Sequence, residues 1–371
     1  MAFLVPFVWN TSYHKTLPEQ LLGSLFGSFM SLHQIQKPFA KGSFMRITNV
    51  HGISLPLALW LLNDEYDYNP DPNYISATTL LKSTKQIILK RRVDSADLEM
   101  DLSDLIPSRL GSAFHDSMEK AWNNKPKISL KKLGYPDDVI DLIRINPTPE
   151  ELAATPNAIP IYLEQRTSRT IEVNGRKITI GGKYDQVVDG HIFDGKSTSV
   201  WGYLAGDKDE DYQKQGSVYR WLNPDIVTDD TMTIMFLFTD WQRMMTKTRA
   251  DYPKIRTVDK EIPLLSLQDT EAFIRDKVAE VYRLIDEPET KLPPCTDKEL
   301  WRSAPTFKYY ADPTKTDGRS TKNFDDAASA NAYWKMEKGG KGVVITTPGE
   351  AKACAYCPAY EICQQRKSYD A

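Results

Sequence analysis

The stretch GGKYDQVVDGHIFDGK, Gly181 to Lys196, decides how the middle of this chain folds. Two short runs rich in apolar residues flank Asp189-Gly190, and an Asp-Gly dipeptide between such runs predicts a β-hairpin closed by a two-residue type I′ turn. With the turn at these residues, Asp185 would face Asp194 across the hairpin. Side chains directly opposite each other in an antiparallel pair share a face, with Cβ atoms about 5 Å apart.

Two carboxylates held this way would repel each other by about 3 kcal/mol at 5 Å and an effective dielectric near 20. A cation between them removes the repulsion, and Mg²⁺ and Mn²⁺ prefer oxygen ligands of this kind. Because side chains alternate along a strand, Lys196 falls on the same face as Asp194. The pattern predicts a metal site. The alternative is a pair of surface aspartates that diverge into solvent or share a proton.

The composition is that of a soluble globular protein: 371 residues, 41% hydrophobic and 26% charged, with a net charge of −3. A nucleic-acid role therefore needs local basic surface, for which KSTKQIILKRR (Lys82 to Arg92) and KPKISLKK (Lys125 to Lys132) are candidates. Ordinary solvated helix faces would explain both equally well. No apolar run is long enough for a membrane helix, and the initial MAFLVPFVW lacks a basic n-region, so we expect mature, cytoplasmic sequence.

The chain reads as an α/β protein with a central mixed sheet flanked by helices. Asn174-Gly175 marks a second hairpin, and the predicted helices span Ser108 to Trp122, Asp211 to Leu222 and Asp325 to Lys338. A further amphipathic helix carries Ile274, Val278, Val281 and Ile285, and TMTIMFLFT (Thr231 to Thr239) predicts a fully buried strand. We expect three regions: an N-terminal mixed region (1–107), a core (108–290) and a C-terminal module (291–371).

The order Asp185, then Asp194-Gly195-Lys196, resembles the PD-(D/E)XK nuclease superfamily, in which the first acid and the acid-x-lysine lie on successive strands. Upstream, GSAFH (Gly111 to His115) is similar to the helical G-x-x-x-H of the RecB-like branch. Downstream, QGSVY (Gln215 to Tyr219) is similar to its Q-x-x-x-Y element. The resemblance covers roughly residues 76–219 and the last twenty residues, and it implies a restriction-endonuclease-like core.

The resemblance also implies roles. One or two Mg²⁺ or Mn²⁺ ions would be held by His115, Asp185, Asp194 and the Gly195 carbonyl. Lys196 would orient or deprotonate the attacking water, or stabilise developing negative charge, while Gln215 and Tyr219 would position the DNA strand. Each residue also has an ordinary explanation, a packed histidine for His115 and a packed tyrosine for Tyr219. For Glu164 and Glu119 we expect ordinary salt bridges, and for the aromatic residues near the motifs (Trp201, Tyr203, Trp221) core packing rather than base stacking.

Three of the four cysteines, Cys354, Cys357 and Cys363, lie within ten residues. Such spacing suits an iron–sulfur cluster or tetrahedral zinc better than disulfides. It resembles the iron–sulfur branch of RecB-like nucleases, which includes AddB and the CRISPR-associated exonucleases, so a [4Fe–4S] cluster is favoured over Zn²⁺. Family members usually place a fourth cysteine near the segment that aligns with SATTLLKSTKQI, which has none. Cys295 is the remaining candidate.

These patterns predict a metal-dependent DNA exonuclease of recombination, repair or phage DNA metabolism, acting on DNA ends or single strands. By resemblance, a single-strand annealing protein or a helicase would be its partner, since no helicase motif is present. Two other classes remain open: a non-catalytic DNA-binding scaffold that retains the fold and cluster, and a zinc-stabilised protein of unrelated function.

Overall fold

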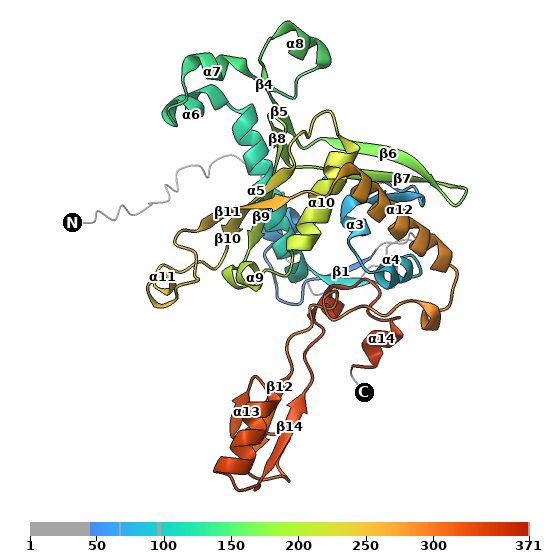
Figure 1. Ribbon diagram of the computed structural model, residues 1–371, viewed down its shortest axis with the longest axis vertical. Coiled ribbons are helices and arrows are strands. Elements are labelled where there is room, and N and C mark those ends of the chain that lie inside the picture. The colour runs from blue at the N-terminus through green and yellow to red at the C-terminus, as the bar shows by residue number, and fades with distance from the viewer. Residues whose placement is uncertain (1–44, 67, 95–97, 370–371) are drawn as a thin grey trace, which may run out of the picture. The chain divides into compact units, whose positions relative to one another are not determined.

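The computed structural model describes residues 45–66, 68–94 and 98–369, and Figure 1 labels its elements. Residues 1–44 of the predicted N-terminal region, including the apolar segment at its start, lie outside the described residues. Within the described ranges, no helix is both long and apolar enough to cross a membrane. The expected region boundaries after residues 107 and 290 remain predictions.

The core is a mixed α/β structure, as predicted. Six strands form a sheet in the order β11-β10-β9-β8-β5-β4, in which β9 runs parallel to β10 and antiparallel to β8. A second sheet has the order β2-β7-β6. The strands are β2 Tyr74–Ser76, β4 Ile143–Ile145, β5 Ile159–Leu163, β6 Arg166–Val173, β7 Arg176–Lys183, β8 Gln186–Val188, β9 His191–Thr198, β10 Thr231–Phe238 and β11 Thr257–Pro263. A short pair, β1 Arg46–Thr48 and β3 Glu99–Asp101, lies apart from both sheets.

Both predicted hairpins are present. Strands β8 and β9 are joined by Asp189-Gly190, whose φ angles are 48° and 89°, and Val187 pairs with Ile192. Strands β6 and β7 are joined by Asn174-Gly175, with φ angles of 51° and 76°. Positive φ at both central residues is the mark of the type I′ turn, and its twist matches that of the flanking strands.

Helices pack on the sheets, and α12 does so through the face that its sequence pattern predicts. The helix predicted from Ser108 is α5, α10 is the one predicted from Asp211, and α12 buries Ile274, Val278 and Val281 completely. The larger helices are α2 Leu55–Leu62, α4 Thr84–Lys90, α5 Ile106–Asn123, α6 Pro126–Lys132, α10 Asp209–Leu222 and α12 Leu267–Leu284. The shorter ones are α3 Ala77–Leu80, α7 Asp137–Leu142, α8 Pro149–Ala154, α9 Val200–Ala205, α11 Met245–Thr248, α13 Ala327–Ala332, α14 Gln364–Lys367 and the 3-10 turns Leu102–Leu105, Glu289–Lys291 and Lys352–Tyr356.

Strand β10 is buried on one face only, so the prediction of a fully buried strand was wrong. Met232, Ile234 and Phe236 are buried in the main core, whereas the alternating residues are half-buried. In the parallel ladder Met235 lies beside Gly195, over which Phe114 of α5 packs, since a Cβ added to Gly195 would lie 2.9 Å from the Phe114 ring. Helix α5 therefore covers this face of the sheet less fully than the main core covers the opposite face.

The C-terminal region contains a small three-stranded sheet. Its strands are β12 (Thr306–Tyr310), β13 (Lys322–Phe324) and β14 (Val343–Thr347), in the order β13-β12-β14. Helix α13 continues as a π-helical turn through Tyr333–Glu337, close to the extent predicted.

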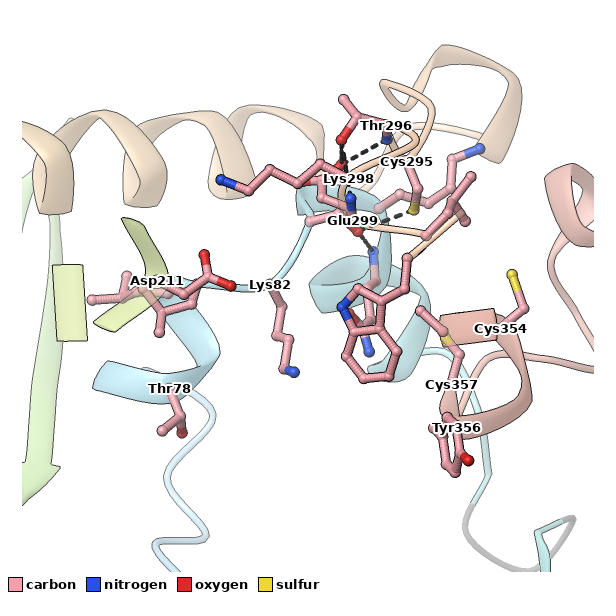
Figure 2. Close-up of a pocket in the computed structure, with 18 of the residues that line it drawn as sticks. Thr78, Lys82, Asp211, Cys295, Thr296, Lys298, Glu299, Cys354, Tyr356 and Cys357 are labelled. Carbon is pink, nitrogen blue, oxygen red and sulfur yellow. Dashed lines mark hydrogen bonds between the residues drawn. The ribbon is translucent and has the colours of Figure 1, made fainter. Parts of the chain in front are cut away.

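The chain before and after this small sheet builds the walls of one cavity. All four cysteines line it, together with residues of α3, α4, α10 and α12, and its volume is about 470 Å³. Figure 2 shows Cys295 on one side and Cys354 and Cys357 on the other, with Lys82 and Asp211 facing the same space. The structure thus brings Cys295 to the three clustered cysteines.

The two turn glycines differ in their surroundings, which allows a matched test of the Asp189-Gly190 hairpin. An added Cβ at Gly190 would lie 2.2 Å from Thr228 Oγ1, whereas one at Gly175 would meet nothing within 4 Å. We expect Gly175→Ala to cost only the left-handed backbone penalty, about 1–2 kcal/mol. Gly190→Ala should lose at least about 1 kcal/mol more of the free energy of unfolding, because Thr228 must move. Urea unfolding of both variants measures the difference, and equal losses would contradict a tightly packed turn.

Candidate metal and active site

Glu164 and Asp185 lie opposite each other where one long antiparallel ladder bends from sheet to sheet. Leu163 pairs with Gln186 in the six-stranded sheet, and Arg166 pairs with Lys183 in the three-stranded sheet, in the same register. That register places Glu164 directly across from Asp185, and the Glu164 N–H donates to the Asp185 carbonyl oxygen at 2.8 Å. Glu164 has a φ of 51°, a left-handed conformation that marks the bend.

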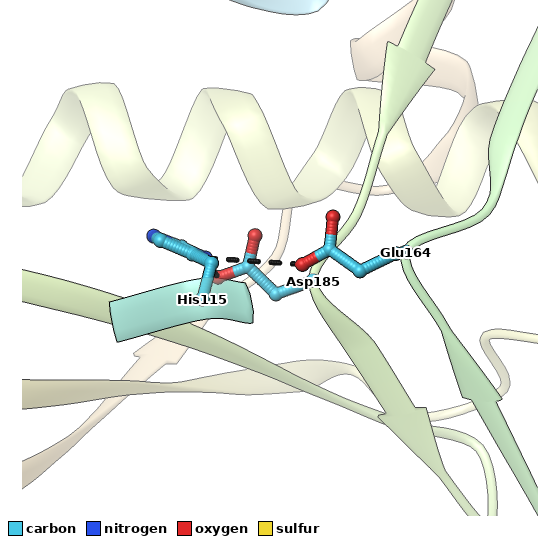
Figure 3. Close-up of side chains that lie close together, drawn as sticks. All are labelled: His115, Glu164 and Asp185. Atoms are coloured by element: carbon cyan, nitrogen blue, oxygen red, sulfur yellow. Dashed lines mark ion pairs between the residues drawn. The ribbon is translucent and has the colours of Figure 1, made fainter. Parts of the chain in front are cut away.

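Helix α5 adds an imidazole to this carboxylate pair. His115 Nδ1 lies 3.0 Å from Asp185 Oδ2 and 4.0 Å from Glu164 Oε1. One ligand atom from each of the three residues lies within 4.8 Å of the others, and Figure 3 shows the three side chains pointing toward one another. Lys183 Nζ also contacts Glu164 Oε2 at 2.6 Å. The ordinary salt bridge expected for Glu164 is present, but the same carboxylate belongs to a group suited to a metal.

Asp194 lies next to this group but is held differently from the arrangement predicted. The β8–β9 ladder ends at Gln186 and Phe193, so Asp185 and Asp194 are not paired as strand residues. Instead, Asp185 Oδ2 accepts a hydrogen bond of 2.8 Å from the Gly195 N–H. The reason is the bend, which removes Asp185 from the strand. The two acids therefore meet through the backbone of β9.

The Asp194 carboxylate is buried, with 1% of the residue exposed. Its Oδ2 forms an ion pair with the Lys196 ammonium, yet no donor makes a hydrogen bond of good geometry to it. A buried carboxylate oxygen without a hydrogen bond is costly, so such an atom marks a place where a further ligand would be stabilising.

Burial and mutual charge set the protonation of these groups. Burial, assisted by the negative charge of Asp185, raises the pKa of Asp194 to about 6, although Lys196 opposes this. Burial lowers the pKa of Lys196, but the charges of Asp194 and Asp185 outweigh it, so that pKa is raised. Burial likewise raises the pKa of Glu164, while the hydrogen bond to Asp185 raises the pKa of His115 against the effect of its own burial. The site concentrates acids that a cation would stabilise in their charged forms.

Helix α10 carries the two residues that match the Q-x-x-x-Y element, Gln215 and Tyr219, and they contact each other next to the site. Gln215 Nε2 donates to the Tyr219 hydroxyl at 2.9 Å, and both residues are buried. The Tyr219 ring packs on Gly182, where an added Cβ would lie 2.8 Å from it. Burial and the negative charges of Asp194 and Asp185 raise the pKa of this phenol well above its usual range. It stays neutral and lies close to both acids.

Other residues considered in the sequence have structural roles. Trp221 is buried and Tyr203 packs on Phe236 and Phe238, as expected for core residues. The same prediction was wrong for Trp201, which is 48% exposed and packs on Tyr252 at the surface. Within the described ranges, no ion pair joins Glu119 to another residue, so the salt bridge predicted for it is not formed. On α6, Lys127 and Lys131 pair with acids of the neighbouring helix, which favours the solvated-face interpretation of that basic stretch.

The four cysteines are free thiols. Among the described residues, no three of their Sγ atoms lie within 4.8 Å of one another. Burial raises the pKa of Cys295, Cys354 and Cys357, and neighbouring thiols add to the increase at all three. Ser83 Oγ lies 3.1 Å from Cys295 Sγ, which brings the start of α4 to the cysteines.

Comparison with known proteins finds distant structural similarity only. No protein-family model matches the chain, and no curated protein matches it. Among solved structures, the crystal structure of SSO0001 gives a TM-score of 0.39 at 15% identity, covering 64% of this chain and 88% of that one. A phage-related exonuclease from Haemophilus somnus 129PT gives a TM-score of 0.22 at 19% identity, over 33% of this chain and 62% of that one.

Proposed function

We propose that the chain is a metal-dependent DNA nuclease with a RecB-like PD-(D/E)XK core, and that it acts as an exonuclease. The observation that carries the proposal is the convergence of His115, Glu164 and Asp185 beside the buried Asp194–Lys196 pair. The sequence pattern marks four of these five residues. The five come from helix α5, the bend at Glu164 and Asp185, and strand β9. A partly buried cluster of this composition, next to a buried carboxylate–lysine pair, is typical of a functional site.

The residues present fit a divalent metal ion. Two carboxylates and one imidazole converge, and a third carboxylate next to them has a buried oxygen without a hydrogen bond. Carboxylate oxygens with one imidazole suit Mn²⁺ or Mg²⁺. We propose His115, Glu164, Asp185 and Asp194 as ligands, with the Gly195 carbonyl beside them. A bound ion would supply Lewis acidity toward a phosphodiester oxygen and lower the pKa of a coordinated water.

Lys196 acts, in this proposal, as a charged group rather than a base. The acids around it raise its pKa, so it keeps its proton at neutral pH and can stabilise negative charge that develops on a phosphate. The buried Gln215–Tyr219 pair supports the site from below and holds the phenol near the acids. We therefore assign the two α10 residues a positioning role.

We propose that the cysteines hold a [4Fe–4S] cluster. Four thiols line one cavity, and four thiolates are the ligand set that a [4Fe–4S] cluster takes. Cys295 as the fourth ligand is supported by its contact with Ser83. This serine lies in the segment where related nucleases usually carry their cysteine. The cluster would tie the C-terminal segment to the core.

Cleavage of end-labelled linear DNA and of covalently closed circular DNA, with Mg²⁺, Mn²⁺ or EDTA, tests the proposed function. The expected result is metal-dependent loss of linear DNA, with the circle resistant and Lys196→Gln at least about 100-fold slower. Circular DNA cut as fast as linear DNA would replace the exonuclease with an endonuclease. Binding of DNA without cleavage in any metal would instead support the non-catalytic scaffold.

Glu164→Gln is expected to weaken Mn²⁺ binding by at least about 10-fold, because the substitution removes one of the two carboxylate charges that converge with His115. Titration calorimetry measures the dissociation constant. Glu119→Gln, one turn beyond His115 on α5, is the matched control and should bind Mn²⁺ like the wild type. Unchanged Mn²⁺ affinity in Glu164→Gln would show that Glu164 forms its salt bridge with Lys183 but does not bind the metal.

A further inference from the structure

Beside the cysteines, the cavity carries two aromatic side chains that the fold does not bury. Trp301 is 42% exposed and Tyr356 is 75% exposed. Their ring centroids lie 6.1 Å apart, with 47° between the planes. Both residues line the cavity, and Figure 2 shows Tyr356 next to Cys357. Trp221, in contrast, is 2% exposed and belongs to the core.

The backbone holds Trp301 in an uncommon conformation. Its φ angle is 48°, in the left-handed region, which bulky L side chains rarely adopt. Burial of the indole does not compensate for the strain, because almost half of the side chain remains in contact with solvent. Strain of this kind persists where a functional site requires a side chain in one position.

Cations without acidic partners lie around these rings. Lys208 Nζ lies 5.3 Å from the Trp301 ring centroid, and Lys82 also lines the cavity. Within the part of the chain that the structure describes, neither lysine forms an ion pair. Three carboxylates also line the cavity: Glu210, which pairs with Lys214 and Lys298, and Asp211 and Glu299. Seven basic side chains line it against these three, so the charge around the cavity is positive on balance.

Helix α10 connects this surface to the candidate metal site. Lys208 is its N-cap residue, Gln215 lines the same cavity, and Gln215 donates to Tyr219 near the two aspartates. At 1.5 Å per residue, Lys208 and Gln215 are about 10 Å apart along the helix axis.

We propose that Trp301 and Tyr356 form a stacking platform for the bases of single-stranded DNA, with Lys82 and Lys208 contacting its phosphates. Flat exposed rings next to unpaired cations bind single strands without sequence preference, because every base offers a π-face and every nucleotide a phosphate. A duplex hides its bases, so the rings select the single strand. The proposal rests on the proposed nuclease function only for the fate of the strand, since binding itself needs no cleavage.

Fluorescence anisotropy with a 5′-fluorescein-labelled oligothymidine of about 20 nucleotides, in EDTA, tests the platform in the full chain. Trp301→Ala and Tyr356→Ala should each raise the dissociation constant about 5- to 100-fold. Trp301→Phe and Tyr356→Phe, which keep a ring, should remain within about 3-fold of the wild type. Lys208→Gln should weaken binding and make it less sensitive to salt. Tyr135→Ala is the matched control, since Tyr135 is 51% exposed and lies outside the cavity.

Unchanged affinity in both alanine variants would overturn the proposal. An equal loss of affinity in Tyr135→Ala would also overturn it. So would a finding that the alanine variants lose as much affinity for a blunt duplex of the same length. Neither result would report stacking on a single strand. If Trp301→Ala does not fold, Tyr356→Ala and the two phenylalanine variants still decide the question. Because EDTA prevents cleavage, failure of the nuclease proposal would leave this binding result unaffected, and the two failures are distinguishable.

Discussion

Asp194→Asn is expected to slow DNA cleavage by at least about 1,000-fold while the protein still folds and binds DNA. The variant keeps the shape of a side chain that is almost fully buried, but it removes the charge of the oxygen that lacks a hydrogen bond. It also takes away the nearest partner of Lys196, so the ammonium is no longer held toward the acids. Single-turnover rates on end-labelled DNA measure the loss.

Asp137→Asn provides the control, because this aspartate is exposed and its ion pair with Lys131 lies on a solvated helix. It should cleave at the wild-type rate. Folding of Asp194→Asn is checked by thermal unfolding, and binding is checked with labelled DNA in EDTA. A folded Asp194→Asn variant that cleaves within 10-fold of the wild type would contradict the proposed active site.

The same variant should change how stability depends on pH in the absence of divalent ions. Burial raises the pKa of Asp194 from 3.8 to about 6, so this carboxyl binds its proton more tightly in the folded state. Its destabilising effect is full above pH 6 and is relieved as the pH falls toward 3.8. Asparagine lacks this relief. Relative to the wild type, Asp194→Asn should therefore be more stable at pH 8 than at pH 5, as thermal unfolding in EDTA will show.

Cys295→Ala is expected to abolish the visible absorption of an anaerobic preparation and to lower the unfolding temperature by about 5–10 °C. The four thiols line one cavity between the core and the C-terminal segment, so a lost ligand releases that segment. Iron content and limited proteolysis report the same event. Full iron content and an unchanged spectrum in Cys295→Ala would exclude this residue as a ligand.

Adding Ser83→Cys to Cys295→Ala should restore iron binding, which makes the test specific. Ser83 Oγ already lies 3.1 Å from Cys295 Sγ, so a thiol at position 83 would face the same space. The double variant moves the fourth thiol to residue 83, the N-cap position of α4. Ser368→Cys, on an exposed residue after α14, should not restore iron binding. If Ser83→Cys and Ser368→Cys each restored iron binding to Cys295→Ala, the added thiols would be binding iron nonspecifically.

Local sequence determined the turns, the main helices and the order of the motifs. Asp189-Gly190 and Asn174-Gly175 adopt the positive φ angles that their residue types tolerate, and α12 buries the face that its periodicity predicts. Such features depend on residues within a few positions of each other. The coarse α/β architecture follows from their order along the chain.

Three features were visible only in the tertiary structure. The Asn174-Gly175 turn already sets the register that brings Glu164 opposite Asp185. The bend that turns both side chains toward His115, however, arises because one antiparallel ladder is shared by two sheets. The burial of Asp194 and the meeting of Cys295 with the other thiols likewise depend on segments far apart in sequence. Hydrogen-bonding preferences act over a few residues, whereas these arrangements follow from long-range packing, which a local pattern does not encode.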